Sequence, residues 1–368
     1  MVLLIRTLYL ALLATVLFTA KAQDPAPLDP LTREAEVYLQ QLATEKGIGI
    51  RQAGTEAEVR AADFIQNTLE GLGYVVKRQS FDYINSLTKE PQTSQNIIAQ
   101  KVGASGRNII LGAHYDSTSA ELGSFGAVDN GASIAVMLAT AKLVAGLEQQ
   151  EYGVTFVAFG AEEVGLIGSY KFVQQISVAQ LDTYLGMINL DSIVGSDNLY
   201  IHSAHSSPYD CKGNTKRYMF DTSLRDQLFK VANSVTQKNT FEIHSGYDSY
   251  PKGETGGWSD HTPFACAGLP IGNFESTNFA INGQSGKDGF SQSTHSSLWT
   301  CFDKKNMSAC DRESEKKWGK IWHTKNDQLD ILESLFPGRI RQQISDNLSV
   351  FRAFFTQLDR HIEAMINK

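Results

Sequence analysis

The chain has 368 residues, of which 42% are hydrophobic and 20% are charged, and its formal net charge is −7. This composition supplies ample apolar material for a packed globular core. The acidic balance argues against nucleic-acid binding, because that function normally requires a basic face. No nucleic-acid partner is therefore expected, while the net charge says little about the substrate.

Residues 1–22 have the pattern of a signal peptide. Arg6 gives a short basic leader, an apolar run extends from Thr7 to Phe18, and the small residues around Lys21 resemble a cleavage site. No later stretch approaches the ~18 consecutive apolar residues of a membrane span. We therefore expect a secreted or periplasmic protein that begins near Gln23 and has no membrane span; a buried N-terminal helix is the alternative.

Residues 23–368 are expected to form one domain, because no repeat or low-complexity linker divides them. Thr55 and Glu58 have capping-box spacing, so a helix should begin there and end at Gly71 to Gly73. Apolar runs indicate buried strands, and apolar residues at helical spacing indicate helices. The predicted strands are 74–81, 108–113, 154–159 and 184–190, and the predicted later helices are 132–147, 165–175 and 337–366.

Strands that alternate with helices are typical of a parallel sheet covered on both faces, so the fold class is α/β. Residues 201–320, rich in glycine and serine, are expected to add the remaining strands and the loops around a substrate pocket. All four cysteines lie in the C-terminal half, an even number that is compatible with an oxidising compartment. Three pairings are open, and Cys301 with Cys310 is favoured over Cys211 or Cys266 because the two are close in sequence; zinc binding by the cysteines is the alternative.

Five short motifs supply residue types that bind zinc. Imidazole nitrogens and carboxylate oxygens are the donors of hydrolytic two-metal centres. Several of these residues come just past predicted buried strands, where the loops of an open α/β sheet converge on one crevice. The motifs are GAHYDS with His114, AVDNGAS with Asp129, FGAEEVG with Glu162 and Glu163, NLDS with Asp191, and WHTKND with His323.

Each motif also has an ordinary structural explanation, such as a turn or a solvated loop, but together they favour a metallohydrolase. Asp129, which precedes a turn-forming Asn-Gly pair, is the predicted bridge between two metals. His114 and Asp191 would complete one zinc site, and Glu163 and His323 the other. Glu162 would then be the free carboxylate that takes a proton from water and passes it to the leaving amine.

The series HYDS, VDNGAS, GAEEVGLIGS, NLDS, SDHTPF and WHTKND resembles the M28 family of zinc-dependent peptidases, and most of all its secreted bacterial aminopeptidases. The similarity extends over nearly the whole mature chain and includes the upstream segment RQAGTEAE. It implies a phosphorylase/hydrolase-like three-layer sandwich, in which helices cover a mostly parallel mixed sheet, and a pair of zinc ions. It also implies that 23–368 is a catalytic domain that removes N-terminal residues from peptides.

Carried over position by position, the resemblance makes His114, Asp129, Glu163, Asp191 and His323 the metal ligands and Glu162 the general base. Asp116 would orient His114, a role with independent physical sense. Trp322, a candidate residue of the substrate pocket, stands where some relatives have an oxyanion-stabilising tyrosine, and Trp258 stands where some have arginine. Asp260 and His261 are expected to line or brace the substrate pocket, and five further histidines are interpreted as ordinary loop, surface or helix residues: His202, His205, His244, His295 and His361.

Two other functions remain open. Glutaminyl cyclases share this scaffold and its WHT and DHxPF strings but use one zinc, and the Asn-Gly pair after Asp129 favours the peptidases over them. A non-catalytic binding ectodomain is less compatible, since the five ligands and the base are all present. The preferred N-terminal residue, the oligomeric state and the source cannot be inferred from these motifs, so any glycosylation at Asn306 and Asn347 also stays open.

Overall fold

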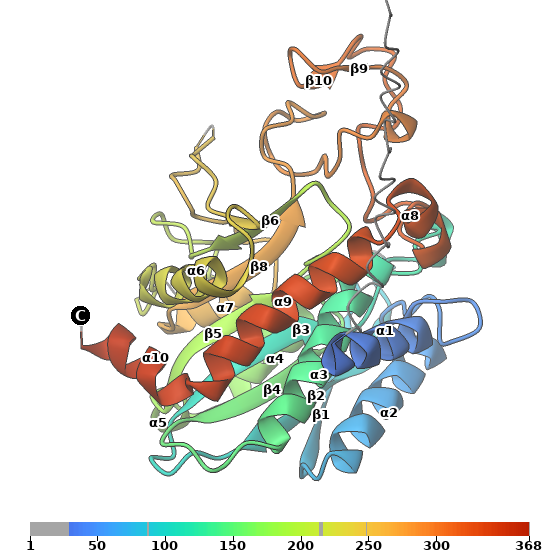
Figure 1. Ribbon diagram of the computed structural model, residues 1–368. Coiled ribbons are helices and arrows are strands. Elements are labelled where there is room, and N and C mark those ends of the chain that lie inside the picture. Colours follow the sequence, from blue (N-terminus) through green and yellow to red (C-terminus); the bar gives the residue numbers. More distant parts are fainter. Residues whose placement is uncertain (1–28, 87, 213–215, 248, 368) are drawn as a thin grey trace, which may run out of the picture.

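A computed structural model describes residues 29–86, 88–212, 216–247 and 249–367 (Figure 1). The predicted signal peptide lies outside these residues. The described chain forms an eight-stranded sheet in the order β1-β2-β4-β3-β5-β8-β6-β7. The strands are β1 Val76–Ile84, β2 Pro91–Lys101, β3 Asn108–His114, β4 Gly153–Phe159, β5 Tyr184–Leu190, β6 Asn198–His202, β7 Phe241–Glu242 and β8 Ile271–Thr277, while β9 Phe302–Asp303 and β10 Ser308–Ala309 form a separate hairpin.

The sheet is mixed, with a parallel centre. Strands β4, β3, β5 and β8 run parallel to one another, as do β6 and β7. Antiparallel pairing occurs between β1 and β2, between β2 and β4, and between β8 and β6. Every residue of β3 and β4 is buried, as expected for central strands covered on both faces.

Helices cover both faces of the sheet and produce three layers. One apolar core joins α1, α2, α3, α6 and α9 to one face, where α9 crosses in front of the sheet in Figure 1. A second core joins α4 and α7 to the other face. The helices are α1 Pro30–Leu42, α2 Glu56–Gly71, α3 Ala132–Ala145, α4 Ile167–Gln175, α5 Val178–Leu181, α6 Ser223–Val235, α7 His261–Ala267, α8 Leu329–Leu335, α9 Arg339–Thr356 and α10 Leu358–Ile366. The predicted α/β sandwich is confirmed.

Several predicted boundaries were wrong for identifiable reasons. The C-terminal helix is two helices, because Gln357 has non-helical dihedral angles (φ −127°, ψ 35°) between α9 and α10. Helix α4 begins later than predicted, because Gly165 and Leu166 have positive φ angles. Tyr74 does not join β1; its hydroxyl instead donates to the Ala141 carbonyl at 2.8 Å.

Only half of the predicted capping box forms at α2. The Thr55 hydroxyl accepts a hydrogen bond from the Glu58 amide at 3.4 Å. The Glu58 carboxylate does not return to Thr55: it is buried and accepts from the Gly54 amide and the Ser94 hydroxyl. Glu58 therefore ties the start of α2 to strand β2.

Among the described residues, one helical stretch, Ala127–Ala145, is long and apolar enough to cross a membrane by length and composition. Its most apolar window is 89% buried within the fold. This stretch includes α3, which packs against α1, α9 and the sheet. Its apolar character is thus explained by its place in the core.

Two disulfides close loops in the C-terminal half. Cys301 pairs with Cys310, which confirms the favoured pairing, and Cys211 pairs with Cys266. The second disulfide links the loop after β6 to α7, and the first closes the β9–β10 hairpin, which projects from the body in Figure 1. Disulfides of this kind persist in oxidising compartments.

The two disulfides should differ in their contribution to stability. Cys211–Cys266 spans 55 residues and Cys301–Cys310 spans 9. The chain-entropy relation gives about 4 kcal/mol for the longer loop and about 2.7 kcal/mol for the shorter one. We predict that the pair of substitutions Cys211→Ala and Cys266→Ala lowers the free energy of unfolding more than Cys301→Ala and Cys310→Ala, measured by urea denaturation. The reverse order would contradict the role assigned to loop length.

Candidate metal centre and active site

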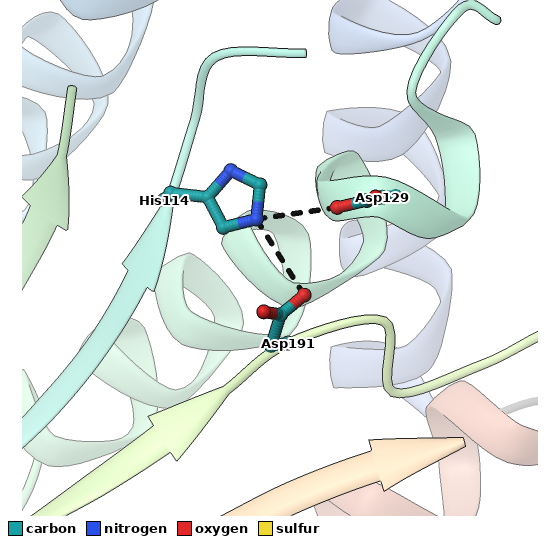
Figure 2. Close-up of side chains that lie close together, drawn as sticks. All are labelled: His114, Asp129 and Asp191. Carbon is teal, nitrogen blue, oxygen red and sulfur yellow. Dashed lines mark ion pairs between the residues drawn. The ribbon is translucent and has the colours of Figure 1, made fainter. Parts of the chain in front are cut away.

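The candidate metal ligands meet at the C-terminal ends of the parallel strands. His114 is the last residue of β3, Asp191 directly follows β5, and Glu162 and Glu163 follow β4. Asp129 lies in the kinked segment Ala127–Gly131 that leads into α3, where its own backbone angles are not helical (φ −117°, ψ 86°). Figure 2 shows the His114 ring facing the carboxylates of Asp129 and Asp191. Five segments that are distant in sequence therefore place their side chains in one crevice, with His323 as the fifth.

Asp129 lies between two groups of side chains. Its Oδ1 is 3.2 Å from His114 Nε2, and its Oδ2 is 2.9 Å from His323 Nε2. His114 Nε2 is also 3.5 Å from Asp191 Oδ1, and His323 Nε2 is 3.1 Å from Glu163 Oε2. Within each group the donor atoms all lie within 4.8 Å of one another. The two groups, each with one imidazole, share a single carboxylate.

These donors fit a pair of zinc ions. Nitrogen and carboxylate oxygen are ordinary zinc ligands, and each group offers three protein ligands, as open catalytic sites do. Glu163 Oε1 is buried and has no hydrogen-bond partner within the described chain. A buried carboxylate oxygen without a donor is costly, so it is compatible with a cation as its partner.

In the metal-free chain the crowded carboxylates shift the titration of their neighbours. Burial alone would lower the pKa of His323, but hydrogen bonds to Asp129 and Glu163 raise it to about 11. Burial likewise opposes the charged form of His114, yet the Glu162 charge and its carboxylate contacts raise that pKa well above the usual value. Burial raises the pKa of Glu163 to about 7 and raises that of Glu162 well above the usual range. These shifts favour the protonated forms of His114 and His323 when no cation is bound.

Asp116 lies next to His114, the residue that it is predicted to orient. His114 Nδ1 faces the backbone carbonyl of Asp116 at 3.2 Å, whereas the nearest Asp116 carboxylate oxygen is 3.6 Å away. That carboxylate also accepts the amides of Glu162 at 3.0 Å and of Glu163 at 3.1 Å. Asp116 thus holds the Glu-Glu turn in place, while its backbone orients the imidazole.

Arg51 is a supporting residue whose role sequence reasoning did not assign, although it begins the RQAGTEAE segment. Its side chain is fully buried, and its guanidinium donates to the carbonyls of Tyr115 at 2.8 Å and Gly126 at 2.8 Å. The first carbonyl belongs to the residue after His114, and the second lies three residues before Asp129. At Gly126 (φ +59°), an added Cβ would lie 2.7 Å from Arg51 Nη2, so the approach requires glycine. Arg51 therefore fixes both ligand loops.

Asp327 and Asn130 complete this support. Asp327, the last residue of the WHTKND motif, accepts the Val128 amide at 2.6 Å and the Asp129 amide at 3.3 Å. Asn130 donates to the Leu190 carbonyl at 2.9 Å and accepts the Ser192 amide at 3.0 Å, which anchors the loop of Asp191. The Asn after Asp129 is therefore more than a turn residue, because it ties the bridging loop to the end of β5.

A cavity of about 220 Å³ opens beside the metal-ligand groups. Trp322 and Trp258 both line it. Asp260 and His261 are not among the described lining residues. Both are fully buried, and His261 Nε2 lies 2.8 Å from the Gly256 carbonyl, so the bracing interpretation fits them. The full described lining is His114, Asp129, Glu162, Glu163, Asp191, Ser192, Trp258, Asn273, Glu275, Ser276, Thr277, Phe279, Asp288, Gly289, Phe290, Trp322 and His323.

Comparison with known protein families decides the classification, because the model of peptidase family M28 matches residues 96–347. The chain belongs to peptidase family M28. All five predicted metal-ligand positions fall inside the matched span, and so does Glu162. Membership in this family makes the protein a zinc-dependent metallohydrolase, and its similarity to proteins named as aminopeptidases agrees with this assignment.

Relatives of this M28 peptidase cover it to different extents. It is 26% identical to the alkaline phosphatase isozyme conversion protein of Escherichia coli over 96% of this chain and 97% of that protein. It is 29% identical to leupeptin-inactivating enzyme 1 of Streptomyces exfoliatus over 83% of this chain but 64% of that protein. It is 33% identical to aminopeptidase YwaD of Bacillus subtilis over 50% of this chain and 36% of the relative.

Solved structures share the fold. A zinc aminopeptidase from Bacillus subtilis matches with a TM-score of 0.58 at 19% identity, covering 88% of this chain and 94% of that one. A glutaminyl cyclase from Porphyromonas gingivalis also matches with a TM-score of 0.58 at 19% identity, covering 91% and 99%. At these identities the likeness establishes the architecture alone, which peptidases and cyclases have in common.

Zinc binding should release protons. Both His323 and His114 have raised pKa values in the metal-free chain, and a zinc ligand must be a neutral imidazole. Loading zinc near neutral pH should therefore displace at least two protons per chain, because Glu163 with its raised pKa adds to the two histidines, and the apparent affinity should rise as pH rises. Isothermal titration calorimetry in buffers of different ionisation enthalpy measures this number. His323→Ala should lower the count, and binding without proton release would contradict the assignment.

Proposed function

We propose that this chain is an exported di-zinc aminopeptidase that hydrolyses the first peptide bond of substrates with a free N-terminus. The observation that carries the proposal is the position of the Asp129 carboxylate between two imidazoles: Oδ1 faces His114 and Oδ2 faces His323. A carboxylate in this arrangement suits two cations rather than one. The catalytic domain would comprise residues 23–368.

In this proposal His114, Asp129 and Asp191 hold one zinc, and Asp129, Glu163 and His323 hold the other. When bound, two such ions lower the pKa of water and polarise a carbonyl oxygen. Asp116, Arg51 and Asp327 hold the ligand loops, so little reorganisation is required during turnover. This rigid support is consistent with a catalytic centre that is assembled before substrate binds.

Glu162 is proposed as the general base. It lines the cavity beside the ligands, and no side-chain hydrogen bond to it is described, whereas its neighbour Glu163 faces His323. Burial and the nearby carboxylates raise its pKa well above the usual range, and bound cations would lower it toward the range useful for proton transfer. Its carboxylate would take a proton from the attacking water and deliver it to the leaving amine.

The free N-terminus of a peptide would bind among the carboxylates. Glu162 and Asp191 both line the cavity and can pair with an α-ammonium group. Trp322 lies next to His323 at the cavity wall, so its indole N–H is the proposed donor to the carbonyl oxygen of the scissile bond. Relatives named as aminopeptidases support this choice of reaction.

Export is supported by the two disulfides and by the signal-like pattern of residues 1–22. A glutaminyl cyclase is the second candidate function, because a cyclase shares the fold. Cyclisation would need one zinc, whereas two groups of donors share Asp129 here, and Asn130 ties their loops together. These features favour the peptidase.

Substrate assays separate these functions. We predict that the zinc-loaded protein releases an N-terminal amino acid from aminoacyl amides and loses this activity with a chelator. Incubation with glutaminyl peptides should give free glutamine rather than the cyclised product, measured by mass spectrometry. Ring closure without release of other amino acids would identify a cyclase, and inertness toward both substrates would sink the enzymatic proposal.

Replacement of the base should separate metal binding from turnover. Glu162→Gln removes proton transfer but leaves the five ligands, so kcat should fall by about 10²–10⁴-fold. Zinc content, measured by mass spectrometry, should stay near the wild-type value. As a matched control, Glu313→Gln changes an exposed glutamate and should keep wild-type kcat. Near-normal turnover of Glu162→Gln would show that another group acts as the base.

A further inference from the structure

The cavity beside the metal-ligand groups has a second acidic part. Glu275 lines it from β8, and Asp288 lines it from the loop that follows β8. Neither residue belongs to the candidate metal ligands, and the described lining contains no lysine or arginine. Two carboxylates on a wall that also carries Trp258, Phe279 and Phe290 require an explanation that the zinc site does not give.

The sheet register places Glu275 one strand beyond the ligands. Leu190 of β5 pairs with Phe274 of β8, so Asp191 and Glu275 are the next residues along two parallel strands. Residues in register on neighbouring strands project from the same face, about 4.8 Å apart. Strand β8 is farther from β3 and His114 than β5 is. Glu275 therefore faces the cavity at a position suited to a substrate side chain rather than to the reacting bond.

The Glu275 carboxylate is held by one oxygen. Oε1 is 2.7 Å from His202 Nδ1, and it accepts from the Thr255 hydroxyl at 3.1 Å and the Asn273 amide at 3.2 Å. Within the described chain, Oε2 accepts no hydrogen bond. Burial would raise the pKa of Glu275, but the contacts with His202 outweigh it and lower the pKa. His202, interpreted from the sequence as an ordinary residue, is thus the buried support of an ionised, cavity-lining carboxylate.

Asp288 adds a second acceptor. Its Oδ1 accepts the Phe290 amide at 3.0 Å, whereas its Oδ2 is buried and has no hydrogen-bond partner within the described residues. An unsatisfied buried carboxylate oxygen costs free energy unless a ligand supplies a donor. Asp288 itself lines the cavity, so its carboxylate adds a second negative charge to the wall beside Glu275.

Aromatic rings share the cavity wall with both carboxylates. Trp258, Phe279 and Phe290 line the same cavity, and Trp258 and Phe290 are 40% and 46% exposed. A guanidinium group stacks on aromatic faces while its N–H groups bind carboxylates, and a lysine ammonium does so less well. Lys320 already places its Nζ 5.8 Å from the Phe290 ring centroid, so this ring accepts a cation nearby.

We propose that the cavity receives a cationic N-terminal side chain, arginine before lysine, and that Glu275 determines this specificity with Asp288 in support. The inference rests on the aminopeptidase function proposed above. The α-ammonium group of the substrate remains with Glu162 and Asp191. Glu275 instead binds the guanidinium, and the rings of Trp258 and Phe290 enclose it.

Aminoacyl amides of arginine, lysine, leucine and citrulline test the proposal, because citrulline is a neutral analogue of arginine. Wild-type kcat/KM should be at least about tenfold higher for arginine than for citrulline, the order expected from one charge-assisted contact. Glu275→Gln should lower the arginine-to-leucine ratio of kcat/KM at least about tenfold. Asp288→Asn should lower it by less, and the exposed-site control Glu313→Gln should leave it unchanged.

Two results would overturn the proposal: a wild-type preference for leucine over arginine, or an equal loss on every substrate in Glu275→Gln. The second would mean that Glu275 binds the α-ammonium group common to all of them. If Glu275→Gln does not fold, judged by circular dichroism, the Asp288→Asn ratio decides.

A binding measurement separates this inference from the proposed function. Free L-arginine, L-citrulline and L-leucine are added to the zinc-loaded wild type, and the shift in Tm is recorded. A larger shift with L-arginine that Asp288→Asn diminishes supports the pocket even if no amide is hydrolysed, in which case only the aminopeptidase function fails. Equal shifts with L-arginine and L-citrulline contradict the pocket assignment.

Discussion

The placement of one carboxylate, that of Asp129, is the constraint on which the site depends. Its two oxygens face different imidazoles, those of His114 and His323. One carboxylate can serve both groups of ligands only if both ligand loops are fixed to within a fraction of an ångström. Asp327 accepts the backbone amides of Val128 and Asp129. Arg51 donates to one carbonyl in the His114 loop and to one in the Asp129 loop. The buried Arg51 guanidinium thus lies behind the cluster of carboxylates, and its positive charge offsets part of the repulsion among them.

The fold explains why such a cluster can exist at a protein's centre. Parallel strands β3, β4 and β5 end at the same edge of the sheet, so the residues that follow these strands lie close together. The burial of these strands on both faces makes the edge rigid. Strand β8 extends the same edge by one position, which brings Glu275 into the cavity. The proposed catalytic and substrate-recognising positions are therefore consecutive places along one sheet edge.

The sequence predicted the α/β architecture and the residues that gather in the site, because buried strands and metal-ligand motifs leave strong local patterns. It did not predict the supports. Arg51 and Asp327 lay in recognised motifs, but their roles depend on contacts between segments far apart in the chain. Asp116 was assigned to the imidazole, and the sequence did not show that its carboxylate also accepts two amides. Asp288, Glu275 and His202 come from a region without periodicity, so no pattern joined them.

Anomalous diffraction from crystals of the zinc-loaded protein at the zinc edge tests the role of Asp129 most directly. We expect two peaks roughly 3.5–4 Å apart. One should lie among His114, Asp129 and Asp191, and the other among Asp129, Glu163 and His323. A single peak, or two peaks of which neither contacts Asp129, would contradict the shared carboxylate and the hydrolytic function built on it.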